Sequence, residues 1–125
     1  MKRHDIRVLA MICLYQHLLL DKDIAESVID NFDKTLKELD DFERILILHS
    51  IEHKERFIEY INEVLEDWSF HRLGYIEQAI LLMACSEFDN KVATPSIIID
   101  EAVELAKTYC DDEAYKLING VLDRI

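Results

Sequence analysis

The segment from Ala79 to Cys85 contains no polar residue, and it constrains the fold more than any other part of this chain. Seven residues make about two turns of an α-helix, so a helix over this segment would be apolar on every side. Such a helix belongs in the middle of a core, where other elements cover it. Polar residues at 77–78 and 86–87 return its ends to the surface. We therefore expect a central helix that stops before Asp89, with the other helices wrapped around it.

Composition favours helix for the rest of the chain as well. The 125 residues include only 2 Gly and 1 Pro, and residues typical of strands are scarce. A chain of this length is most simply one domain, residues 1–125, that buries about two thirds of its unfolded surface. We therefore predict an all-α fold.

Apolar spacing and capping residues predict where the helices begin and end. The first helix is expected over residues 4–20, followed by chain breaks near 21, 34 and 40. Three start signals lie beside these breaks, at Asp23, Thr35 and Asp40, and each has Glu three residues later. Residues 41–67 keep helical spacing, as one long helix or as two helices joined near His53.

The last third of the chain carries two further helix starts. Thr94 followed by Pro95 is a strong N-terminal signal, because proline fits the first helical position. The acidic run 111–113 favours the positive end of a final helix. Gly120 lies inside that helix at a cost of about 1 kcal/mol against alanine, which suggests close approach of a neighbouring backbone.

Charge is distributed unevenly. The formal net charge is −12, which argues against indiscriminate binding to nucleic acid or anionic lipid. Residues 1–20 hold three basic residues and one acidic residue, so the remaining chain carries a net charge of −14. Arg3 and Arg7 are one helical turn apart and share a face, so we expect a small exposed cationic patch there, unless both are merely solvated charges.

Cysteine usage and motifs limit the classes of protein further. Cys13, Cys85 and Cys110 are odd in number and lack a C-x-x-C spacing, which is typical of a reduced, cytoplasmic protein. The apolar run 8–15 is too short to span a bilayer. No phosphate loop, nucleophile elbow or dinucleotide turn is present, so we expect neither catalysis nor a cofactor.

One short pattern suggests a metal site. His49, Glu52 and His53 match H-x-x-E-H, in which two histidines one turn apart bind zinc and the glutamate acts as a base. Helical geometry places the pair opposite Ile47, on the face of Arg56, and no third ligand is evident. We therefore interpret both histidines as solvated and expect no metal.

Several blocks of residues resemble a known family. They comprise the runs 14–16, 68–81, 100–107 and 118–123, together with Arg3, Arg7 and Ala10. In order and spacing these blocks are similar to the NusB family of bacterial transcription antitermination factors. The resemblance implies a compact bundle of about six to seven helices in two small sub-bundles, with an N-terminal lobe over about 1–67 and a C-terminal lobe over about 68–125.

The resemblance also implies a function without chemistry. NusB proteins pair with NusE, a protein of the small ribosomal subunit, and the pair holds a boxA-type RNA element of nascent rRNA. The transcript is thereby tethered to elongating RNA polymerase, and premature termination is suppressed. By position, Arg3 and Arg7 match arginines of the family's basic first helix that bind the RNA backbone, and the charge of Lys2 is expected to help them. Tyr15 and Glu77 match positions of the NusE-facing surface.

Departures from the family pattern leave a second interpretation open. His4 and Asp5 stand where the family's first helix usually carries further arginines, and Ser86 replaces a frequent tyrosine. Each lost phosphate contact weakens RNA binding and its salt dependence. The alternative is a protein-interaction adaptor, as a monomer or a homodimer, that kept the fold but lost most of its RNA binding.

Overall fold

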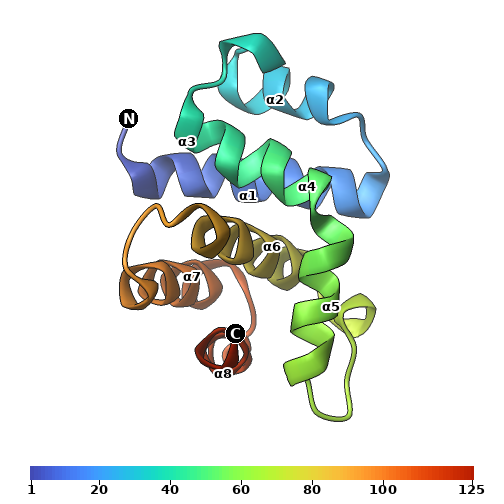
Figure 1. Ribbon diagram of the computed structural model, residues 1–125. Coiled ribbons are helices and arrows are strands. Elements are labelled where there is room, and N and C mark those ends of the chain that lie inside the picture. Colours follow the sequence, from blue (N-terminus) through green and yellow to red (C-terminus); the bar gives the residue numbers. More distant parts are fainter.

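The computed structural model describes all residues from 1 to 125, and helix is its only regular secondary structure (Figure 1). The elements in chain order are α1 (Arg3–Leu20), α2 (Ile24–Phe32), η1 (Leu36–Glu38), α3 (Asp41–Arg44), η2 (Ile45–His49), α4 (Ser50–Glu52), α5 (Lys54–Val64), η3 (Phe70–Arg72), α6 (Tyr75–Asn90), α7 (Pro95–Tyr109) and α8 (Ala114–Arg124). When α3, η2 and α4 are counted as one continuous helix, the chain has seven helices besides the short 3-10 helices η1 and η3. This confirms the predicted all-α bundle. None of them combines the length and the apolar content needed to cross a membrane.

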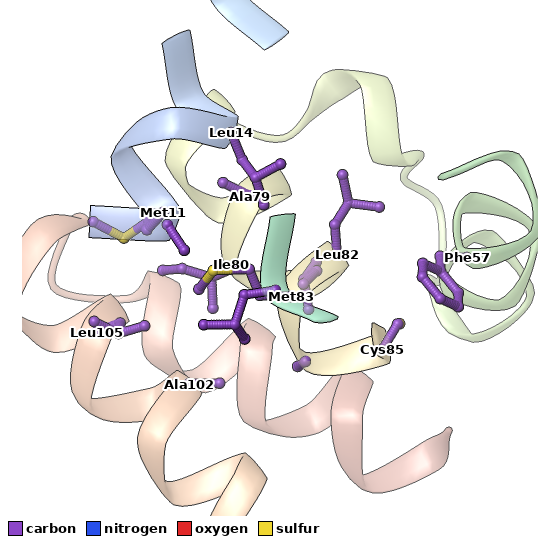
Figure 2. Close-up of a cluster of buried hydrophobic side chains, with 14 of the residues drawn as sticks. Met11, Leu14, Phe57, Ala79, Ile80, Leu82, Met83, Cys85, Ala102 and Leu105 are labelled. Atoms are coloured by element: carbon purple, nitrogen blue, oxygen red, sulfur yellow. The ribbon is translucent and has the colours of Figure 1, made fainter. Parts of the chain in front are cut away.

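Helix α6 lies at the centre, as predicted. Every residue from Ala79 to Cys85 is at most 3% exposed. Helix α1 packs on one side of α6 and α7 on another, and η2 and α8 also contact it (Figure 1). Figure 2 shows side chains of α6 directed both toward Met11 and Leu14 of α1 and toward Ala102 and Leu105 of α7. Burial of each large aliphatic side chain contributes about 1.5–3 kcal/mol, so this helix holds the other elements together.

The core is continuous across both halves of the chain. A single cluster of 28 buried residues includes Leu14 and Phe57 from the first half, and Leu105 and Ile118 from the second. Its continuity means that the elements before and after residue 67 bury their apolar faces against one another. A division into lobes at 67/68 remains a prediction.

Two of the capping signals read from the sequence, Asp23 and Asp40, make the expected bonds. Asp23 accepts a hydrogen bond from the Ala25 amide at 3.2 Å. Asp40 accepts from the Glu43 amide at 2.8 Å, while Glu43 accepts from the Asp40 amide at 2.8 Å, which completes a capping box. Helix α7 begins at Pro95 as predicted, although the Thr94 side chain makes no capping bond.

The segment predicted as helical over 41–67 is broken at His53, whose backbone (φ −107°, ψ 19°) leaves the helical region. It also contains a feature that the sequence did not predict, the π-helical turn η2. A π turn is closed by i to i+5 backbone hydrogen bonds in place of the usual i to i+4 bonds. The Ser86 hydroxyl donates to the carbonyl of Ile45, and the Ser50 hydroxyl donates to that of Leu46 at 2.6 Å.

Two local predictions were wrong. Helix α6 does not stop before Asp89 but continues to Asn90, and Lys91 ends it in the left-handed conformation (φ 51°). Gly120 is not approached by a neighbouring backbone, because no atom lies within 4 Å of the position that a Cβ would occupy. Its helical propensity cost is therefore not compensated by packing.

Candidate RNA interface

The three basic residues predicted to bind RNA differ in exposure. Lys2 precedes α1 and Arg3 lies in its first turn, and both are exposed. Arg7 is only 4% exposed. The expectation of an exposed arginine pair is therefore wrong for Arg7. Helical spacing placed it correctly below Arg3, but α6 packs across that face of α1 and covers it (Figure 1).

Arg7 forms a buried ion pair with Glu87 of α6. Its Nε donates to Glu87 Oε2 at 3.0 Å and its Nη2 donates to Oε1 at 2.7 Å, which is the bidentate geometry of a strong pair. Glu87 is 3% exposed, and Glu101 of α7 lies 3.7 Å from Arg7 Nη1. Carboxylates of two helices therefore hold the guanidinium, which joins α1 to α6 instead of presenting a charge to solvent.

Arg3 is held at the surface by contacts that the sequence did not predict. Its Nη1 donates to the carbonyl of Val92 at 3.3 Å, and its guanidinium carbon lies 4.4 Å from the ring centroid of Phe42. Phe42 belongs to α3 and follows the apolar pattern of 41–67, so the sequence suggested only a core role. Val92 follows the end of α6. No local pattern links positions 3, 42 and 92, because packing alone brings them together.

Lys91 is a further basic residue at this end of the molecule. It is exposed and directly precedes Val92, whose carbonyl accepts the bond from Arg3. The exposed cations Lys2, Arg3 and Lys91 are named here the N-terminal basic surface. His4, whose Nδ1 lies 3.4 Å from Glu101 Oε2, borders it.

Tyr15 and Glu77 lie at the opposite end of the α1/α6 pair. The two helices are antiparallel, since Arg7 bonds Glu87 while Leu18 and Gln78 line one small cavity. Because the later part of α1 lies beside the start of α6, Tyr15 and Glu77 are near the same end, and both are half-buried. Twelve helical residues separate Tyr15 from Arg3, which is about 18 Å. Glu77 also accepts a 3.4 Å bond from the Gly74 amide, so it caps α6.

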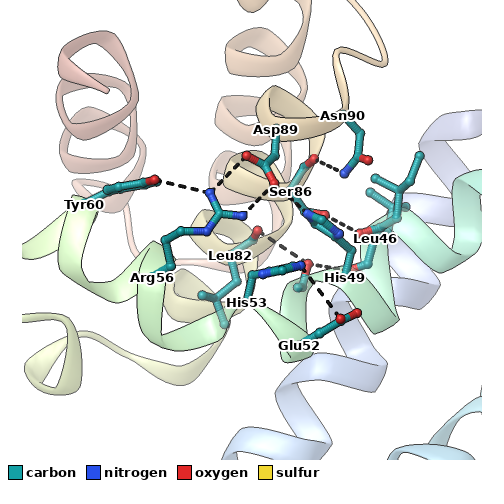
Figure 3. A network of polar contacts seen from close by, with 12 residues as sticks. Leu46, His49, Glu52, His53, Arg56, Tyr60, Leu82, Ser86, Asp89 and Asn90 are labelled. Atoms are coloured by element: carbon teal, nitrogen blue, oxygen red, sulfur yellow. Dashed lines mark hydrogen bonds and ion pairs between the residues drawn. The ribbon is translucent and has the colours of Figure 1, made fainter.

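The histidines of the H-x-x-E-H pattern belong to a polar network (Figure 3). His49 Nε2 lies 2.7 Å from Asp89 Oδ2, and Arg56 donates to both oxygens of the same carboxylate at 3.1 and 2.8 Å. The interpretation of His49 as solvated holds only in part, since its side chain is 23% exposed and one ring nitrogen is engaged by Asp89. No group of three or more His, Cys, Asp or Glu side chains is arranged to hold a metal ion.

All three cysteines are free thiols. Burial raises the pKa of Cys13 and of Cys85 to about 12, and that of Cys110 to about 11. Thiolates are the nucleophilic form, and raised pKa values disfavour them at neutral pH. These cysteines therefore serve packing.

An all-helical bundle of one continuous core, with three exposed cations at one end, places this chain among the small helical bundle proteins. The chain belongs to the NusB family, whose model matches residues 4–125. It is 38% identical over 126 residues to the transcription antitermination protein NusB of Exiguobacterium sp., covering 100% of this chain and 97% of the relative. It is 39% identical over 127 residues to that of Staphylococcus haemolyticus, covering 100% and 99%.

Solved structures agree with the family assignment. The T. maritima NusB structure superimposes with a TM-score of 0.84 at 28% identity, covering 99% of this chain and 89% of that one. A structure of antitermination factors NusB and NusE in complex with dsRNA gives a TM-score of 0.81 at 28% identity, covering 97% and 92%.

Proposed function

We propose that this chain is a transcription antitermination factor that, together with NusE, binds a boxA-type element in nascent rRNA and suppresses premature termination. The observation that carries the proposal is membership of the NusB family over residues 4–125, combined with a fold shared with a NusB that forms a complex with NusE and dsRNA. Its role is to tether the transcript to elongating RNA polymerase in the cytoplasm, without chemistry of its own.

Within this function the two ends of α1 take different tasks. The N-terminal basic surface contacts RNA phosphates, with Arg3 and Lys2 as the predicted contacts and Lys91 added by the fold. Arg7, predicted from sequence as an RNA contact, supports the site from below through Glu87. Tyr15 and Glu77 contribute to the surface for NusE. The separation of about 18 Å along α1 allows RNA and NusE to bind at the same time.

A second function is favoured by the charge of the molecule. With a net charge of −12 and Arg7 buried, few cations oppose the repulsion of phosphate. A protein-interaction adaptor that binds NusE but holds RNA poorly, as a monomer or a homodimer, fits these two observations. Whether the NusE complex binds RNA more tightly than NusE alone decides between the two functions.

The test is a titration of fluorescent rRNA leader RNA with this chain, with NusE, and with the two together. We expect tight binding only from the pair, because NusE supplies further phosphate contacts. Arg3→Glu should weaken RNA binding by the pair while leaving NusE binding unchanged.

Lys116→Glu provides a matched control, because it makes the same change in net charge at an exposed residue of α8. If the two charge reversals weaken RNA binding equally, only the overall field matters and the N-terminal basic surface is not the RNA site. If the pair binds RNA no better than NusE alone, the adaptor function replaces the one proposed.

A further inference from the structure

Two guanidinium groups lie close to one aromatic ring at the base of the N-terminal basic surface. The guanidinium carbon of Arg3 lies 4.4 Å from the ring centroid of Phe42, and that of Arg7 lies 5.2 Å from it. Both distances are within the range in which a cation is attracted to the face of an aromatic ring. Phe42 is half-buried, so its ring is fixed by packing on the core side.

The two arginines have different freedom to move. Arg7 is locked, since both oxygens of the buried Glu87 accept bonds from it. Arg3 is exposed and makes one 3.3 Å hydrogen bond, to the Val92 carbonyl. A guanidinium has five N–H donors, so most of the Arg3 donors remain available for a ligand. The contact with Phe42 is therefore the main one that limits the orientation of the Arg3 side chain while leaving these donors free.

A long arginine side chain loses conformational entropy when it binds a ligand in one orientation. A group that already restricts the guanidinium reduces that loss, which is how preorganisation increases affinity. Aromatic stacking suits this purpose, because it constrains the plane of the guanidinium while the N–H edge points outward. Phosphate oxygens are the ligands that match such an edge.

We propose that Phe42 is a positioning residue for RNA binding, which holds the Arg3 guanidinium stacked on its ring so that the free N–H edge faces an RNA phosphate. This role rests on the proposed RNA-binding function of the N-terminal basic surface. The locked Arg7–Glu87 pair supports the arrangement from beneath by fixing the position of α1 relative to α6. Phe42 acts through Arg3 and does not itself contact RNA.

A double-mutant cycle in the complex with NusE tests the role, with rRNA leader RNA as the probe. Phe42→Leu should weaken RNA binding by about two- to fivefold, which corresponds to the strength of an exposed cation–π contact. Phe42→Tyr keeps the ring face and should bind RNA as the unmodified protein does. In a protein that already carries Arg3→Ala, Phe42→Leu should cause no further loss, because its effect passes through Arg3.

Controls separate this role from a structural one. Phe32→Leu removes another half-buried ring, on α2, which unlike Phe42 takes part in no cation–π contact, and it should leave RNA binding unchanged. Melting temperature and NusE affinity are measured for every variant. Equal losses from Phe42→Leu with and without Arg3 would mean a structural role and would overturn the proposal.

The outcomes also distinguish failure of this role from failure of the proposed function. If Arg3→Ala leaves RNA binding by the pair unchanged, the RNA site and the Phe42 role are both wrong. If Arg3→Ala weakens binding but Phe42→Leu does not, only the Phe42 role is wrong. Should Phe42→Leu fail to fold, Arg3→Lys replaces it: a lysine keeps the charge without planar stacking, so equal RNA affinity would overturn the proposal.

Discussion

Arg7 and Glu87 are nearly inaccessible to water and neutralise each other. Replacing Arg7 with alanine leaves the Glu87 carboxylate buried and without its main partner. Removing one member of a buried pair typically costs about 3–5 kcal/mol, so Arg7→Ala should lower the free energy of unfolding by that amount. Urea unfolding followed by circular dichroism measures the change.

Arg3→Ala is the matched control, one helical turn away, and it should change the free energy of unfolding by less than about 0.5 kcal/mol because Arg3 is exposed. Equal stability of the two variants would contradict the buried pair. Substitution of Arg7 therefore tests the fold, whereas substitution of Arg3 tests the proposed RNA contact.

Asp89 gives the molecule a defined acid sensitivity. Hydrogen bonds from Arg56, and to a lesser degree from His49, lower the pKa of Asp89 from 3.8 to about 2. A group whose pKa is lower in the folded state stabilises the fold above its unfolded pKa, and this stability is lost as the pH falls through the folded pKa. Asp89→Asn should therefore be less stable than the unmodified protein above about pH 4, and the difference should shrink toward about pH 2.

Thermal melts of both proteins across this range measure the effect. A difference in melting temperature that stays constant with pH would show that Asp89 contributes only packing. The network in Figure 3 connects α5 to the end of α6, so its loss should also loosen the contact between these two helices.

At the scale of the element, α6 tolerates no polar side chain in its middle. Ala84 is 2% exposed and lies within the apolar segment. An unpaired carboxylate there cannot be solvated, so Ala84→Asp should cost about 4 kcal/mol or more, a large part of a typical domain's stability of 5–15 kcal/mol. Tyr75→Asp, at the exposed start of the same helix, is the control. Circular dichroism should show loss of helix only for Ala84→Asp.

Helix α8 should gain stability from a single methyl group. A Cβ at Gly120 would meet no atom within 4 Å, and the residue lies inside the helix. Alanine has a higher helix propensity and a less flexible unfolded state, so Gly120→Ala should raise the free energy of unfolding by about 0.5–1 kcal/mol. Chemical denaturation measures the gain, and a loss of stability would mean that a neighbouring element packs closer than the structure indicates.

At the scale of the whole molecule, the excess of acidic charge leaves few cations for RNA, so RNA affinity should depend only weakly on salt concentration. The chain carries −12 in total, whereas the N-terminal basic surface offers three exposed cations, Lys2, Arg3 and Lys91. The logarithm of the binding constant for a single strand falls with the logarithm of salt concentration by about 0.7 per phosphate contact. Arg3→Ala should therefore reduce the slope measured for the complex with NusE by about 0.7.

Lys91→Ala should reduce the same slope by a similar amount, although Lys91 lies far from Arg3 in the sequence. Titrations at several salt concentrations measure both slopes. An unchanged slope for Lys91→Ala would restrict the RNA contact to the first helix.

The candidate site was only partly predictable from the sequence. Lys2 and Arg3 were identified through charge distribution and family resemblance, and the structure leaves both exposed. Phe42 was hidden in an apolar pattern that fits a core residue equally well. The pairing of Glu87 with Arg7 could not be predicted either, because the two residues are 80 positions apart and only the packing of α1 on α6 brings them together.

The sequence by itself determined the helical class, the central position of α6 and the starts of most helices. These properties depend on apolar periodicity and on capping bonds between residues no more than about four positions apart, so local composition is sufficient to specify them. Only the tertiary structure decided that Arg7 is buried, that Arg3 stacks on Phe42 and that His49 bonds Asp89. Burial and pairing of charges depend on which helix faces cover one another, and that choice is made by packing the whole core at once.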